Sequence, residues 1–141
     1  MRLSILLIAL LLSACATQPN SASFEAEYSP AGSQLAASPS PASPGGVAQL
    51  SLQNGAARPV GYNLCMVALE QLDAGLWIPA RSHAVSCPQE FASLASGAVV
   101  TGEAALPASL EPGTYRYVTQ LSASSENLPD VQLRGEPFRV D

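Results

Sequence analysis

Apolar side chains recur at every second residue in several short runs of this chain, which is the pattern of a half-buried β-strand. In the run at 47–53, Ala48, Leu50 and Leu52 fall on one side and polar residues on the other. The same reading favours strands at 24–28, 60–72, 76–78, 98–106 and 114–122, and an interrupted last strand over 131–140. Turn residues such as Asn54 and Gly55 separate the runs. About seven short strands at this spacing predict an all-β sandwich of antiparallel strands.

Two stretches lack this alternation. Residues 29–46 read SPAGSQLAASPSPASPGG, and proline at this density excludes a helix or a paired central strand. We therefore expect a Pro/Ser-rich insert at 29–46 inside a domain that spans 23–141. The stretch 80–97 is expected to be a loop, with a brief helical turn around 88–94.

The amino-terminal segment has the layout of an export signal. One positive charge, Arg2, precedes an apolar run at 3–12, which is too short to cross a bilayer as a helix but fits a secretory signal. The run ends in Leu-Ser-Ala-Cys at 12–15, which resembles the lipobox of bacterial lipoproteins at all four positions. An ordinary signal peptide with an incidental Cys15 is the alternative.

The lipobox resemblance implies a diacylglyceryl group on the Cys15 thiol and cleavage before Cys15. Residues 1–14 are then the signal peptide and 15–22 a lipidated tether. Two or three acyl chains hold a protein on a membrane firmly, whereas one chain binds marginally. Ala16 follows the cysteine, which favours the outer membrane, facing the periplasm, if the source has two membranes. We expect a location in the cell envelope.

Charge narrows the choice of partners. The chain has 141 residues, with six Lys and Arg against eleven Asp and Glu and a formal net charge of -5 at pH 7. Lysine is absent and the arginines are scattered, so the clustered positive charge that nucleic acid requires is missing. We exclude nucleic acid as a partner.

Several short motifs point to one family. They are LSLQN at 50–54, YNLC at 62–65, GLW at 75–77, EPGTYR at 111–116 and a second cysteine at Cys87. As a set they resemble the bacterial immunoglobulin-like domains of secreted proteins and lipoproteins. The resemblance implies an immunoglobulin-like sandwich in which Tyr115 forms a tyrosine corner. Tyr117 stands where the usual inter-sheet disulfide would have its second cysteine, so that bridge is absent.

The remaining cysteines predict a different bridge. If Cys15 carries lipid, Cys65 and Cys87 form an even pair in an oxidising compartment, where a disulfide is expected. A redox pair is disfavoured because such cysteines usually lie in a Cys-x-x-Cys motif. His83 lies near Cys87, but a closed zinc site needs four ligands. We expect no metal and no cofactor beyond the covalent lipid.

Aromatic residues are assigned to the core. Trp77 is expected to be a core anchor rather than an exposed binding residue, and Arg116 to lie in solvent or at the rim. Specifically, Leu50, Leu64, Trp77 and Tyr115 should share one interior.

No catalytic constellation is found in the sequence. Ser82, His83 and Ser86 are neighbours in one loop without an orienting acid, and Glu25 and Glu27 fit a solvated strand face better than a glycosidase pair. We expect a protein that is not an enzyme.

Three functions remain open. The first is a non-catalytic binding module of a membrane-anchored envelope lipoprotein, with an unknown envelope protein as partner and its contact surfaces at 54–59 and 80–97. The second is a structural accessory lipoprotein of an envelope complex. The third is a protease-inhibitor-like sandwich, suggested by fold analogy alone.

Overall fold

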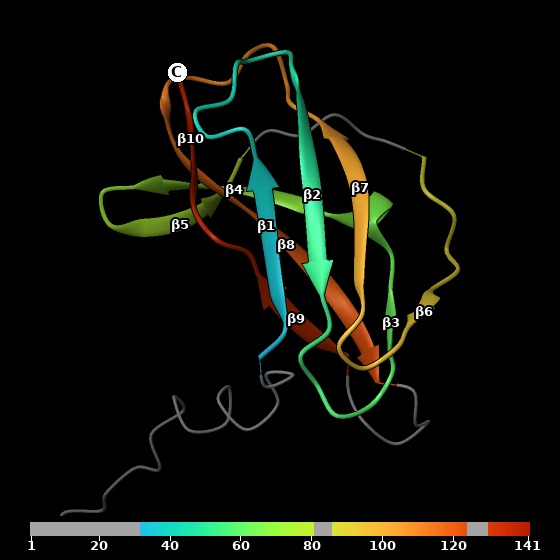
Figure 1. Ribbon diagram of the computed structural model, residues 1–141. Helices are drawn as coiled ribbons and strands as arrows, with labels where there is room; N and C mark the ends of the chain where they lie inside the picture. Colours follow the sequence, from blue (N-terminus) through green and yellow to red (C-terminus); the bar gives the residue numbers. More distant parts are fainter. Residues whose placement is uncertain (1–31, 81–85, 124–129) are drawn as a thin grey trace, which may run out of the picture.

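The computed structural model describes residues 32–80, 86–123 and 130–141, which form two antiparallel sheets packed face to face (Figure 1). The first sheet has the strand order β1-β2-β7, with β1 at Gln34–Ser38, β2 at Val47–Gln53 and β7 at Val99–Ala105. The second contains β3 (Val60–Tyr62), β4 (Ala68–Asp73), β5 (Leu76–Pro79), β6 (Ala92–Leu94), β8 (Gly113–Ala123), β9 (Val131–Arg134) and β10 (Phe138–Val140).

Strand β8 organises the second sheet. On one side its first half pairs with β4 and its last residues pair with β3. On the other side it pairs with β10 and then with β9. The β5 strand extends the sheet beyond β4, and β6 extends it beyond β3. Because β8 is 11 residues long, it can pair with four neighbouring strands.

This order is that of an immunoglobulin-like sandwich. The strands β1, β2 and β7 occupy the positions of A, B and E, while β5, β4 with β3, β8, and β9 with β10 occupy C′, C, F and G. The prediction of an all-β, immunoglobulin-like antiparallel sandwich is confirmed.

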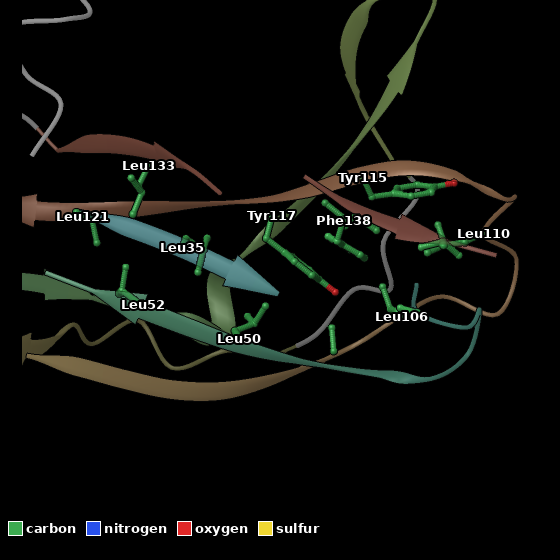
Figure 2. Close-up of a cluster of buried hydrophobic side chains, with 14 of the residues drawn as sticks. Leu35, Leu50, Leu52, Leu106, Leu110, Tyr115, Tyr117, Leu121, Leu133 and Phe138 are labelled. Atoms are coloured by element: carbon green, nitrogen blue, oxygen red, sulfur yellow. The ribbon is translucent and has the colours of Figure 1, made fainter. Parts of the chain in front are cut away.

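The core lies between the sheets, as the alternation predicts (Figure 2). From the first sheet, Leu35, Leu50 and Leu52 point inward, and from the second Leu121 faces them, while Tyr115 fills the same interior further along β8. Each of these side chains is at most 2% exposed. Burying a leucine or tyrosine side chain contributes on the order of 2 kcal/mol, so this shared interior is what holds the two sheets together.

The expectation of a strandless insert at 29–46 is wrong. Residues 34–38 form β1, which pairs along its whole length with β2. Leu35 and Ala37 face inward between more exposed neighbours, and the strand lies between Pro30 and Pro39, so no proline falls within the ladder. Between Pro41 and Pro44, Ala42 is buried and forms a parallel bridge with Val140. The first strand therefore switches from one sheet to the other, and the prolines lie at the crossing.

The strand predicted over 60–72 is interrupted. A 3-10 turn, η1 at Leu64–Met66, separates β3 from β4. Asn63 caps it, because its Oδ1 accepts a hydrogen bond from the Cys65 amide at 3.1 Å. The turn leaves Leu64 only partly buried against the core. A side chain that bonds its own backbone two residues on favours a turn over a ladder, which explains the break.

The helical turn expected around 88–94 is also wrong, since Ala92–Leu94 forms strand β6 against β3. The last strand over 131–140 is interrupted as expected, and both of its parts pair with β8. The strand predicted at 24–28 lies outside the described residues.

Trp77 is not a core residue. Cross-strand pairing sets Trp77 opposite Leu72, and Glu70 opposite Arg116, all on the outer face of the sheet. The Arg116 guanidinium lies 4.2 Å from the centre of the Trp77 ring and pairs with Glu70 at 2.7 Å. Arg116 is thus held between partners rather than free in solvent. Successive side chains of a strand point to opposite faces of the sheet. Because Tyr115 faces the core, the adjacent Arg116 faces outward.

Of the four residues expected to share the interior, the structure places two there. Leu50 and Tyr115 are fully buried. Leu64 packs against the core only in part, and Trp77 lies on the opposite face of its sheet.

Candidate binding groove beside a free sheet edge

Tyr115 has a structural role. Its hydroxyl donates a hydrogen bond to the Glu111 carbonyl oxygen at 2.7 Å, four residues upstream. This is the contact that defines a tyrosine corner. Burial raises the pKa of Tyr115, and the charge of Glu111 raises it further, while the backbone hydrogen bond opposes both. The hydroxyl therefore stays protonated and serves the fold.

Cys65 and Cys87 form a disulfide, as predicted. Their Cα atoms are 5.6 Å apart and the bridge spans 22 residues of sequence. It joins η1 to the segment that leads into β6. Asn63 supports the same junction, because its amide donates hydrogen bonds to the Pro88 and Glu90 carbonyl oxygens. The bridge and the asparagine fix the position of η1.

Asn54 is likewise a structural residue. It was expected to lie in an exposed turn at 54–59, yet its side chain is fully buried. Its amide donates to the carbonyl oxygens of Arg58, at 2.8 Å, and Leu94, at 3.0 Å. The turn is therefore tied to the end of β6.

Strand β7 has a free edge. It stands last in the order β1-β2-β7. Two backbone hydrogen bonds, from Leu106 N to Gly46 O and from Asn54 N to Ala98 O, show at both ends of the ladder which residues of β7 bond to β2. Because hydrogen-bonded and non-bonded pairs alternate in an antiparallel ladder, the N–H and C=O groups of Thr101, Glu103 and Ala105 point away from β2. Within the described part of the chain, no strand pairs with them.

The edge of β5 contrasts with that of β7. There the Ala80 amide donates a hydrogen bond to the Leu69 carbonyl oxygen, towards β4. The nitrogen of the preceding residue, Pro79, therefore points away from β4. A proline that faces outward prevents the pairing of another strand, a common protection of sheet edges. Between 99 and 105, β7 has no proline and one charged residue, Glu103. The β7 edge is therefore long and open to pairing.

A groove runs along this edge. Its volume is about 350 Å³, and it separates β7 from η1 and β4. The lining residues are Gly102, Glu103, Ala104, Ala105 and Pro107 on the β7 side, and Leu64, Cys65, Val67, Leu69 and Tyr117 opposite. Four consecutive β7 residues contribute. Since alternate side chains of a strand point to opposite faces, a groove that touches consecutive residues touches the backbone edge.

Tyr117 forms part of the groove wall and has an unusual hydroxyl. Its ring stacks on Phe138 with centroids 5.4 Å apart, and the residue is 4% exposed. Figure 2 shows its hydroxyl directed into the space between the sheets. That oxygen has no hydrogen-bond partner among the described residues. Burial raises the pKa of Tyr117 to about 12, so the hydroxyl stays neutral in the closed interior behind the groove wall.

The sequence does not reveal this groove. It identifies the strand at 98–106, but which edge of a strand lies free depends on the order of strands in the sheet. The one signal available was the small size of Gly102, Ala104 and Ala105, and Leu64 packs directly against the first of these. Tyr117 was assigned to the core, and its unpaired hydroxyl emerges only from the packing.

Other predicted sites lie elsewhere. Cys15 and His83 are outside the described residues. Within the ranges that are described, no three His, Cys, Asp or Glu side chains cluster as metal ligands would. The same ranges contain no helix that is long and apolar enough to span a bilayer.

Comparison with known proteins returns no matching family model and no matching curated protein. Among solved structures, one similar chain is the ASH / PapD-like domain of human CEP192 (PapD-like domain 7), at 17% sequence identity and a TM-score of 0.40. The alignment covers 99% of this chain and 94% of that one. The fold assignment rests on the strand order and pairing described above, and not on this neighbour.

Proposed function

We propose that this protein is a non-catalytic binding module of the cell envelope, anchored to a membrane by lipid on Cys15. The observation that supports binding is the apolar groove beside the free edge of β7. Apolar concave sites with a few polar groups are where proteins hold ligands and partners, and unpaired strand edges attract other chains. The lipobox resemblance supports the anchor, and Ala16 favours the outer membrane in a source with two membranes.

Site-specific photo-cross-linking in intact cells tests the binding function. A photoreactive phenylalanine at Ala105, an exposed position on the free edge beside the groove, should give a cross-linked adduct of defined mass. The same residue at Gln132, an exposed position on β9, is the matched control and should give none. Equal labelling from both positions, or none from either, would overturn the proposal that the groove is the binding site.

The anchor is tested separately. Replacing Cys15 by alanine should abolish labelling by a radioactive fatty acid and move the protein from the membrane to the soluble fraction. Replacing Cys87 by alanine is the control, because it removes a cysteine but not the lipobox. Continued acylation of the Cys15→Ala variant would refute the lipid anchor.

A further inference from the structure

We propose that the groove binds an extended segment of a partner protein, which adds to the first sheet as a strand beside β7. This inference rests on the proposed binding function and specifies the kind of ligand that the groove binds. The segment has apolar side chains at every second position, facing the groove, and a basic residue on its other face.

Backbone geometry supports an added strand. The outward N–H and C=O groups of Thr101, Glu103 and Ala105 recur at every second residue, which is the spacing at which a neighbouring strand forms its ladder. Residues 102–105 extend for about 13 Å at roughly 3.3 Å per residue, so the walled part of the edge accommodates about four residues. A compact ligand would leave these backbone groups unpaired.

The walls select the side chains. Opposite β7, the groove presents Leu64, Val67 and Leu69. Gly102 and Ala104 are the inward-facing residues at this end of β7, and Leu64 packs directly against Gly102, where a Cβ atom would lie 3.1 Å from Leu64 Cδ1. An added strand would place its inward side chains beside Ala104 and against Leu64, Val67 and Leu69. Apolar residues fit there, because burial of unpaired polar groups is unfavourable.

Tyr117 lines the groove, but its hydroxyl oxygen is closed to solvent. Its hydroxyl is a donor without an acceptor, on a side chain that packing with Phe138 holds in place. A buried donor left unpaired is costly, so this hydroxyl weakens the interior and offers no contact to the bound segment.

Glu103 sets the charge preference. Its carboxylate lies on the outer face of the edge, where it accepts one hydrogen bond from the Gln49 amide at 2.7 Å. A residue directly opposite on an added strand would lie within reach of the same carboxylate, and opposite charges favour each other in such pairs. The chain as a whole is acidic, with a net charge of -5. A second copy of this chain is therefore disfavoured, and a segment with Arg or Lys is favoured.

Binding of a synthetic peptide to the full chain in detergent tests the proposal. The probe RVTVRVTVR alternates apolar and polar residues, and RVVTRTVVR has the same composition without the alternation. We expect the alternating peptide to bind at least about tenfold more tightly and to shift the amide resonances of Val99–Ala105. Equal affinities would show charge attraction only and would overturn strand addition.

Two variants at Glu103 separate the effect of backbone pairing from the effect of charge on binding. Glu103→Pro removes an outward N–H that β2 does not use, and its ring blocks a neighbouring strand. Glu103→Ser makes the same change in charge and retains the N–H. We expect Glu103→Pro to weaken binding at least about tenfold more than Glu103→Ser. An equal effect of both variants would refute backbone pairing.

The cross-linking experiment distinguishes failure of this inference from failure of the proposed function. If Ala105 captures a partner equally well in the Glu103→Pro background, the groove binds without strand addition. If Ala105 captures nothing, the binding function itself fails.

Discussion

At the scale of the residue, two neighbouring tyrosines on one strand have different roles. Tyr115 and Tyr117 both face the core from β8. Tyr115 closes a hydrogen bond to the Glu111 carbonyl, whereas the hydroxyl of Tyr117 has no partner in the described structure. One hydroxyl stabilises the fold through a hydrogen bond, and the other contributes no hydrogen bond to it.

Replacing each tyrosine by phenylalanine separates these roles. Tyr115→Phe should lower the free energy of unfolding by about 1 kcal/mol, the net contribution of a typical hydrogen bond, and leave the Glu111 carbonyl unpaired. Tyr117→Phe should leave the free energy of unfolding unchanged or raise it slightly, because no hydrogen bond is lost. Urea titration of both variants measures the difference. An equal loss in both would contradict the assignment of roles.

Alkaline pH provides a second test of Tyr117. Burial raises its pKa to about 12, above the value of 10.0 in the unfolded chain. The unfolded state therefore loses its proton first, so the stability contributed by the neutral hydroxyl is complete below pH 10 and declines as the pH rises towards 12. At pH 11 the loss should be about 1 kcal/mol.

The chain suits this measurement because it has no lysine, so tyrosines are the side chains that titrate in this window. The free energy of unfolding of the parent protein should fall from pH 9 to pH 11, and Tyr117→Phe should reduce that fall. If the variant declined as steeply as the parent protein, the raised pKa would belong to another tyrosine.

At the scale of the element, strand β7 pairs on one side only. Amide hydrogen exchange should therefore alternate along it. The amides of Val100, Gly102 and Ala104 donate to β2 and should exchange slowly, whereas those of Thr101, Glu103 and Ala105 should exchange at least about tenfold faster. Two-dimensional NMR in deuterated water resolves the individual rates. Uniform protection along the strand would show that its outer edge is already paired.

The same scale shows what the sequence can predict. Period-two alternation locates β2, β7 and β8, because one face of each strand is buried and the other is not. It failed at β1, where a high proline content outweighed the alternation of Leu35 and Ala37. It also failed at η1, where the side chain of Asn63 competes with the ladder. Alternation within one strand separates its two faces, but which face is buried depends on how the strand pairs with its neighbour. The pairing is not visible in the sequence, so Trp77 was wrongly predicted to lie in the core.

The candidate site depends on relations between strands, so the sequence could supply only its parts. The disulfide was predictable from the count of cysteines and the expected compartment. The tyrosine corner was predictable from the spacing of Glu111, Gly113 and Tyr115. The groove was not, because it forms where β7 meets η1, and residues about 40 positions apart along the chain line its walls.

At the scale of the whole molecule, charge and the free edge act against each other. An open strand edge promotes association between copies, whereas a net charge of -5 at pH 7 keeps them apart. The pI is about 4.7, so this repulsion disappears as the pH falls towards that value. We expect the protein to be monomeric at pH 7 and to self-associate near its pI.

The two variants at Glu103 show whether this association uses the β7 edge. Both remove one negative charge, so repulsion between copies weakens equally in Glu103→Pro and Glu103→Ser. Only proline blocks backbone pairing, so sedimentation velocity near pH 4.7 should show self-association in Glu103→Ser and much less in Glu103→Pro. Equal association would place the contact elsewhere, and the exposed apolar side chains of Leu76 and Ile78 on the β4–β5 hairpin would then be the surface to mutate. Suppression by proline alone would mean that the edge is available for pairing in solution and that charge keeps it unoccupied by other copies at neutral pH.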